Sequence, residues 1–155
     1  GEVFVFAFFG FVAVAGTAYL QTGAWEPLAF AAAIPVGAIV SGILVVNNLR
    51  DLATDRAAGK RTLATRIGAR ATKAEFLVLL AAAYATPAGM LLTGASSSAV
   101  LLPLASLPLA VPLVRTVRAD GDPRRLNAVL RGTARLSLVF GVLFAAGLAL
   151  GGRPL

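Results

Sequence analysis

The segment LAFAAAIPVGAIVSGILVVNN, from Leu28 to Asn48, places 21 residues in a row without a charged side chain. A helix needs about 20 such residues to cross the ~30 Å hydrocarbon core of a bilayer. Four further charge-free segments have comparable length: Val3–Leu20, Phe76–Ser98, Ala99–Val114 and Leu136–Leu150. Five crossings use about 100 residues, so little of the 155-residue chain remains for a soluble domain. The sequence predicts an all-α, polytopic transmembrane helical bundle that forms one domain over residues 1–155.

The composition excludes several classes of protein. Hydrophobic residues make up 58% of the chain and charged residues 14%, against ~45–50% and ~25% in soluble domains. The chain has no Cys, so disulfides and thiolate metal sites are excluded. It also has no His, so it cannot supply the base of a Ser-His-Asp triad or an imidazole ligand.

The net charge of +7 comes from basic residues in alternate loops. Seven lie between the second and third segments and six between the fourth and fifth, which accounts for thirteen of the fourteen. The intervening loops, residues 21–27 and 93–98, have none. This alternation is the positive-inside pattern, so we expect a multi-pass protein of the cell (inner or plasma) membrane, with the N-terminus and both basic loops cytoplasmic. Anionic lipid headgroups or an anionic substrate explain the charge better than nucleic acid, and no nucleic-acid partner is expected.

Polar residues gather where the second segment ends, in the sequence NNLRDLATD from Asn47 to Asp55. No helix-breaking residue occurs before Gly59, so we expect one helix to continue through Asp55. At about 100° per residue, Asp51, Asp55 and Asn48 then fall about 40°, 80° and 100° from Asn47. Two carboxylates and two amides therefore share one sector of the predicted helix.

Two carboxylates one turn apart at a membrane boundary need a positive partner. Arg50 and Arg56 project at about 300° and 180° on the same helix, away from that sector. A divalent cation is the better partner, and oxygen ligands without His or Cys favour Mg²⁺, which commonly bridges carboxylates to a substrate phosphate. Lys60, Arg61 and Arg66 follow and could bind the same phosphate. The residues predict a magnesium–diphosphate site at the end of a helical bundle.

The stretch NNLRDLATDRAAGKRTLATRIG, Asn47–Gly68, resembles the second aspartate motif of the UbiA-type membrane prenyltransferases. It is most similar to the 1,4-dihydroxy-2-naphthoate polyprenyltransferases of menaquinone synthesis. Residues 1–23 and 125–136 are also similar to that subfamily. The resemblance implies a nine-helix bundle with two aspartate motifs facing one cavity. The chain is then expected to be a C-terminal fragment with helices five to nine and the later motif, lacking the N-terminal helices.

The resemblance also implies an activity. A polyprenyl diphosphate would be ionised with the help of Mg²⁺, and the ring of 1,4-dihydroxy-2-naphthoate would take the prenyl group and lose CO₂, giving demethylmenaquinone. Asp51 and Asp55 would be the catalytic metal ligands, and Asn47 and Asn48 would line the site. Lys60 and Arg66 would bind the diphosphate, and Arg50 would either partner the aspartates or anchor an acidic substrate.

Two alternatives remain open at the level of the sequence. The same fold could act on 4-hydroxybenzoate or another aromatic acceptor. The chain could instead be a non-enzymatic transporter subunit with Asp51 and Asp55 as an ion-coupling pair. A transporter favours ionisable residues near mid-bilayer, whereas those of this chain lie toward the ends of the predicted spans.

Overall fold

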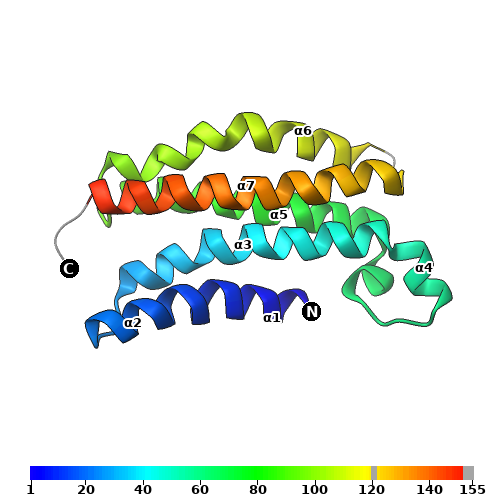
Figure 1. Ribbon diagram of the computed structural model, residues 1–155, viewed down its shortest axis with the longest axis horizontal. Coiled ribbons are helices and arrows are strands. Elements are labelled where there is room, and N and C mark those ends of the chain that lie inside the picture. The colour runs from blue at the N-terminus through cyan, green and yellow to red at the C-terminus, as the bar shows by residue number, and fades with distance from the viewer. Residues whose placement is uncertain (120–121, 152–155) are drawn as a thin grey trace.

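The computed structural model describes residues 1–119 and 122–151, and the elements of this part of the chain are helices (Figure 1). In chain order they are α1 (Glu2–Val5), the π-helix η1 (Phe6–Ala15), α2 (Gly16–Thr22), α3 (Pro27–Arg50), α4 (Leu52–Ala57), α5 (Leu63–Leu92), the 3₁₀-helix η2 (Ser98–Ser106), α6 (Leu107–Arg118) and α7 (Pro123–Leu150). The elements α1, η1 and α2 follow one another directly and form one rod, as do η2 and α6.

Five helical rods are long and apolar enough to cross a membrane, as predicted. They are Glu2–Thr22, Pro27–Arg50, Leu63–Leu92, Ser98–Arg118 and Pro123–Leu150. Two of them begin thirteen residues before the charge-free segments that predicted them, at Leu63 rather than Phe76 and at Pro123 rather than Leu136. The absence of charge marks only the part of a helix that suits hydrocarbon, whereas helical structure also forms among the charged residues outside it. In Leu63–Leu92 the helix is broken at Gly68, whose φ of 82° and ψ of 169° are not helical, so the residues before it form a short separate helical segment.

Neighbouring rods run in opposite directions along the bundle, with α3 at its centre (Figure 1). The α3 helix contacts η1, α5 and α7. In its most apolar stretch 61% of the residues are buried, against 11% for the rod Glu2–Thr22. The first rod is therefore peripheral, and α3 positions the polar residues at its own C-terminal end against several neighbours.

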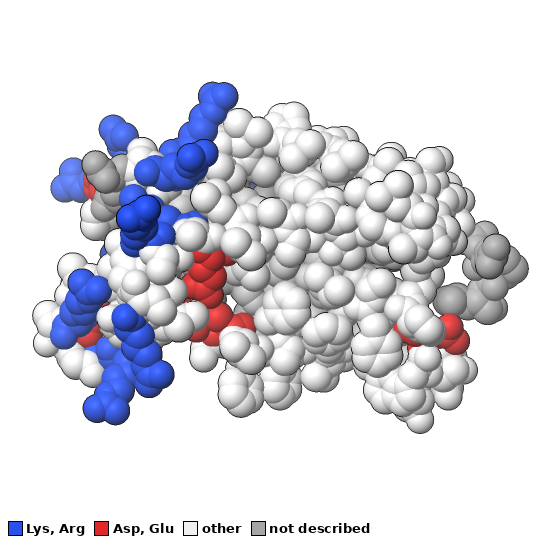
Figure 2. Space-filling view, turned by 180° about the vertical axis from the view of Figure 1, so that it is seen from behind, with Lys and Arg blue, Asp and Glu red and all other residues white. Residues whose placement is uncertain are grey.

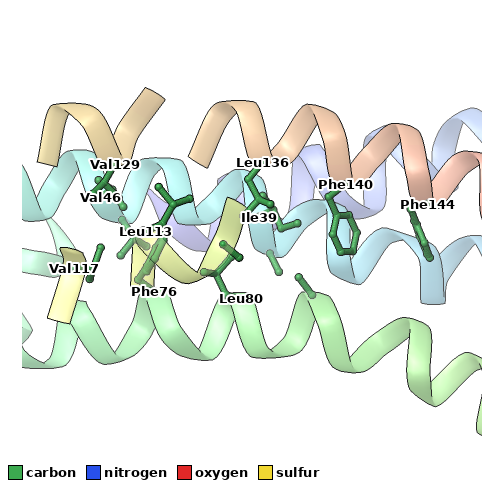
Figure 3. Close-up of a cluster of buried hydrophobic side chains, with 14 of the residues drawn as sticks. Ile39, Val46, Phe76, Leu80, Leu113, Val117, Val129, Leu136, Phe140 and Phe144 are labelled. Carbon is green, nitrogen blue, oxygen red and sulfur yellow. The ribbon is translucent and has the colours of Figure 1, made fainter. Parts of the chain in front are cut away.

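The hydrophobic core lies between α3, α5, α6 and α7, whose side chains point toward one another in Figure 3. Ile39 and Val46 come from α3, Phe76 from α5, Val117 from α6 and Phe140 from α7, and all are almost completely buried. Branched and aromatic side chains packed in this way make many dispersion contacts, which fix how the helices sit against each other.

The first rod joins the bundle through two glycines. A Cβ atom on Gly10 would lie 2.8 Å from the carbonyl oxygen of Ala33, and one on Gly37 would lie 2.9 Å from that of Phe6. The backbones of η1 and α3 are therefore in direct contact, as small residues allow between membrane helices. The glycines permit this approach, and the wider π-helical turn occurs in the same segment.

We expect Gly10→Ala to destabilise the complete gene product in detergent by about 1–3 kcal/mol, because the added methyl group would force η1 away from α3. Gly16→Ala is the matched control, since a Cβ atom there meets nothing within 4 Å. Equilibrium unfolding of both variants measures the difference. Equal stability of the two variants would contradict the close contact.

Candidate active site

The helix that carries the polar cluster is interrupted at Asp51. Its backbone has φ −91° and ψ 6°, so α3 ends at Arg50 and the short helix α4 begins at Leu52. The prediction of one helix through Asp55 is therefore wrong. The stop at Gly59 is confirmed, because this glycine has φ 69° in the left-handed region that other residues rarely adopt. Residues 51–62 lie at the end of the bundle (Figure 1).

Asp51 is paired with the neighbouring Arg50. The guanidinium donates from Nε to Oδ1 and from Nη2 to Oδ2 of the carboxylate, both at 2.7 Å. This two-point geometry is the strongest that arginine and a carboxylate form. The prediction that Arg50 points away from the aspartates is therefore wrong, because it assumed ideal helical angles where the helix ends.

Arg50 also connects two helices. Its Nη2 donates to Oδ1 of Asn47 on α3 and its Nη1 to Oδ1 of Asn127 on α7, each at 2.9 Å. Arg50 thus has bonded partners for three of its nitrogens, and its side chain is fixed between α3 and α7. Hydrogen bonds to Asn47 on α3 and Asn127 on α7 therefore hold the Arg50–Asp51 pair in place.

Asp55 has its own cation. Its side chain is buried, with 7% exposed, and its Oδ1 accepts a hydrogen bond of 2.9 Å from Lys60 Nζ, whose side chain is 66% exposed. The hydrogen bond to Asp55 raises the pKa of Lys60, and the charge of Asp51 adds to the effect. Lys60 therefore interacts electrostatically with both carboxylates. We call the group formed by Asp51, Asp55, Arg50 and Lys60 the charge cluster.

Two of the predicted site residues lie apart from this cluster. Asn48 is 8% exposed and donates from Nδ2 to Glu2 Oε1 at 2.6 Å, a contact between α3 and the start of the first rod. Arg66 is exposed on the first turns of α5, and the three ion pairs found among residues 1–119 and 122–151 do not include it. The structure brings together Asn47, Arg50, Asp51, Asp55 and Lys60.

The cluster has the donor chemistry of a magnesium site, but not a full set of ligands. Asp51, Asp55 and Asn47 offer carboxylate and amide oxygens, which Mg²⁺ prefers. Both carboxylates are bonded to side-chain cations. In the described part of the chain no group of three or more acidic residues could hold a metal ion. These residues would fit one side of a cation site, which would need further ligands.

A groove of about 450 Å³ opens beside the cluster, between the first rod, α3 and α7. Its volume is within the range of ligand sites. Apolar side chains dominate the lining, and Asn47 and Arg131 are its polar members. Asn47 belongs to both groove and cluster, and Arg131 lies one helical turn, about 6 Å, beyond Asn127 on α7. We call this the α3–α7 groove; its apolar lining is Val5, Val40, Ile43, Leu44, Leu130 and Ala134.

In the face shown by Figure 2, Lys and Arg gather at one end, acidic residues lie on the inner side of this basic group and near the opposite end, and a wide uncharged band lies between them. Both basic loops belong to the basic end, as the alternation of basic residues predicted. The cluster and the mouth of the α3–α7 groove therefore lie where a bilayer surface would meet the bundle.

Comparison with known proteins now places the chain. A sequence model of the UbiA prenyltransferase family matches residues 1–139. The chain belongs to the UbiA prenyltransferase family. It is similar to the 1,4-dihydroxy-2-naphthoate octaprenyltransferases of Mycobacterium leprae, at 39% identity over 98% of the chain and 51% of that protein, and of Escherichia coli, at 32% over 97% and 49%. It is also 33% identical to the Drosophila melanogaster UbiA prenyltransferase domain-containing protein 1 homolog, over 93% of the chain and 39% of that protein.

The chain spans about half the length of the curated bacterial relatives it matches. No solved structure matches it. The family membership confirms the resemblance carried by Asn47–Gly68, whereas the roles of the individual residues stay predictions.

Sequence reasoning missed three residues that the fold places near these features. Asn127 bonds Arg50, Arg131 lines the groove and Glu2 bonds Asn48. Asn127 and Arg131 are four positions apart, which puts them on one face of a helix. That spacing could have indicated a shared site. It was not used, because the neighbouring arginines are already explained by membrane topology. Glu2 had no such signal, because its partner is 46 positions away.

We expect the pKa of Asp51 to lie below its ordinary value of 3.8, because the Arg50 hydrogen bonds favour the carboxylate more than burial opposes it. A carboxyl whose pKa falls on folding stabilises the folded protein at every pH above its ordinary pKa. This stabilisation is lost as the pH drops through the lowered pKa of the folded state. Carbon-13 NMR of labelled aspartate gives the value. Arg50→Gln should raise it, whereas Arg124→Gln should leave it unchanged. A value above 3.8 in the wild type would contradict the pairing.

Proposed function

We propose that this chain forms part of an intramembrane enzyme that transfers the prenyl group of a polyprenyl diphosphate to 1,4-dihydroxy-2-naphthoate. The observation that carries the proposal is the charge cluster of Asp51 and Asp55 next to an apolar groove, to which Asn47, a hydrogen-bond partner of Arg50, connects it. An amphiphilic diphosphate needs both features, since its head is strongly anionic and its chain belongs in lipid. The names of the bacterial relatives favour this acceptor.

Asp51 and Asp55 are proposed to hold Mg²⁺ together with ligands from the half of the relatives that this chain does not cover. The bound ion would neutralise charge on the diphosphate and make it a better leaving group. Lys60 has an exposed ammonium on a long stem, so it can leave Asp55 and bind a diphosphate oxygen. Arg66 is exposed at the same end and adds a second donor.

The reaction breaks two bonds and forms one carbon–carbon bond. The bond from C1 of the prenyl group to the diphosphate oxygen breaks, and its electron pair leaves with the diphosphate. Electrons of the electron-rich ring form the bond to C1, the carboxylate leaves as CO₂, and the electron pair of its bond to the ring restores the aromatic diol, so no oxidant is needed. The apolar walls of the α3–α7 groove keep water from the electron-poor prenyl group, which would otherwise be hydrolysed.

Arg50 has a positioning role in this proposal. Its guanidinium is fixed by Asn47 and Asn127 and presents Asp51 in one orientation. Asn48 supports the same helix end from the opposite side through Glu2. The basic end of the bundle is proposed to face the cytoplasm of a cell whose plasma membrane holds the protein, since basic loops are retained on that side.

In the complete gene product, Asp51→Asn and Asp55→Asn should each lower prenyl transfer by about two orders of magnitude or more, because the leaving diphosphate loses its counter-charge. Asp122→Asn is the control, since Asp122 caps α7 at the same end of the bundle outside the cluster. Product formation from a polyprenyl diphosphate is measured in membranes that contain equal amounts of each protein. Wild-type turnover of either cluster variant would refute the assignment.

The acceptor is tested separately with the wild-type protein. Purified complete gene product should prenylate 1,4-dihydroxy-2-naphthoate with release of one CO₂ per product and should not prenylate 4-hydroxybenzoate. Adding a chelator should stop the reaction, and Mg²⁺ should restore it. Preference for 4-hydroxybenzoate would contradict the proposed acceptor but would leave the proposed prenyltransferase activity unchanged.

A further inference from the structure

A second pocket, of about 540 Å³, lies between α6 and α7 near the basic end of the bundle. We call it the α6–α7 pocket. Its walls are largely apolar, with Pro112 and Leu113 from α6 and Ala128 and Val129 from α7, and two guanidinium groups line it, those of Arg115 and Arg125. It shares no lining residue with the α3–α7 groove and contains neither Asp51 nor Asp55.

The pocket concentrates positive charge. Arg115 is in the last turn of α6 and Arg125 in the first turn of α7, and no carboxylate occurs among the described lining residues. A third cation is adjacent, because Lys73 Nζ on α5 donates to the carbonyl oxygen of Ala119, which also lines the pocket, at 2.9 Å. Charges of one sign that share a pocket repel each other unless an anion lies between them.

The shape of the pocket identifies the kind of anion. A small hydrated anion gains nothing from apolar walls, whereas an amphiphile gains from both parts of the pocket. Arginine forks match the oxygens of a phosphate group. Basic pockets between membrane helices on the basic side of a protein are suited to anionic lipid headgroups. The pocket also lies between the ends of two membrane-length helices, at the level where headgroups are found.

We propose that the α6–α7 pocket binds the phosphate of an anionic phospholipid, with Arg115 and Arg125 on the phosphate oxygens and the first methylene groups of the acyl chains along Pro112, Leu113, Ala128 and Val129. The bound lipid joins the ends of α6 and α7. The positive-inside pattern requires basic residues in the loop between α6 and α7 but does not depend on their exact positions. The proposal needs these two.

The chain offers a matched control for the experiment. Arg118 and Arg124 are in the same two helix turns as Arg115 and Arg125 and carry the same charge, but they do not line the pocket. The double variant Arg115→Gln/Arg125→Gln and the control Arg118→Gln/Arg124→Gln therefore change net charge equally. Neither removes a residue of the charge cluster, so prenyl transfer provides an independent check of folding.

The experiment titrates the complete gene product, delipidated in neutral detergent, with phosphatidylglycerol, phosphatidylcholine or inorganic pyrophosphate, and follows binding by native mass spectrometry. Phosphatidylglycerol should bind the wild type and the control variant, and the pocket variant should lose at least about tenfold in affinity. Phosphatidylcholine should bind far more weakly to all three proteins. Pyrophosphate, which the proposed diphosphate site can also bind, should bind equally to all three, because neither double variant alters that site.

Equal loss of affinity in both double variants would overturn the proposal, because it would show a response to net charge alone. Unchanged binding in the pocket variant would overturn it as well, and so would a loss of pyrophosphate binding, confined to the pocket variant, that matches its loss of phosphatidylglycerol binding. If the pocket variant does not fold, Arg115→Lys/Arg125→Lys replaces it. This variant keeps the charge and removes the two-point fork, so a several-fold loss of phosphatidylglycerol affinity supports the site and wild-type affinity overturns it.

Discussion

The bundle depends on how a central membrane helix ends in charged residues. Neighbouring helices pack against several sides of α3. They limit the access of bulk water to the last helical turn of α3. Asp51 and Asp55 follow at a place where an unpaired carboxylate would be costly. Arg50 and Lys60 remove that cost by direct bonding. The backbone break at Asp51 is part of this solution, because it brings the neighbouring side chains of Arg50 and Asp51 face to face.

The same constraint links the cluster to the rest of the fold. Arg50 bonds Asn127 on α7 and Asn47 on α3, and Asn48 in the same turn bonds Glu2 on the first rod. Three rods are thus joined at one end by side-chain hydrogen bonds. Along their length they are joined by apolar packing and by the backbone contact at Gly10 and Gly37. A site held in this way is pre-positioned, which is what transfer of a reactive group requires.

The number of spans and the fold class could be predicted because they follow from the length of charge-free segments. The starts of α5 and α7 could not, since Leu63 and Pro123 begin helices that are charged at first and apolar later. At the site, the sequence identified Asp51, Asp55, Asn47 and Lys60 as neighbours. The helix angles misplaced Arg50, because angles on an ideal helix fail where a helix ends, whereas the family resemblance had allowed Arg50 as a partner of the aspartates. Contacts such as Asn48–Glu2 and Arg50–Asn127 join residues 46 and 77 positions apart, and they depend on packing that no local pattern contains.

The charge balance of the cluster explains how one arrangement can serve both as a stable resting state and as half of a diphosphate site. Two carboxylates and two bonded cations sum to zero, so the cluster is electrically satisfied. In the proposed function, Asp55 and Asp51 would hold a divalent cation that neutralises charge on the diphosphate, and Lys60, bonded only to Asp55, could leave it to bind the incoming diphosphate. Arg50 differs from Lys60 because it is fixed by two asparagines and stays on Asp51. In this proposal the exposed lysine would be the exchangeable partner, and the anchored arginine would keep Asp51 in one orientation.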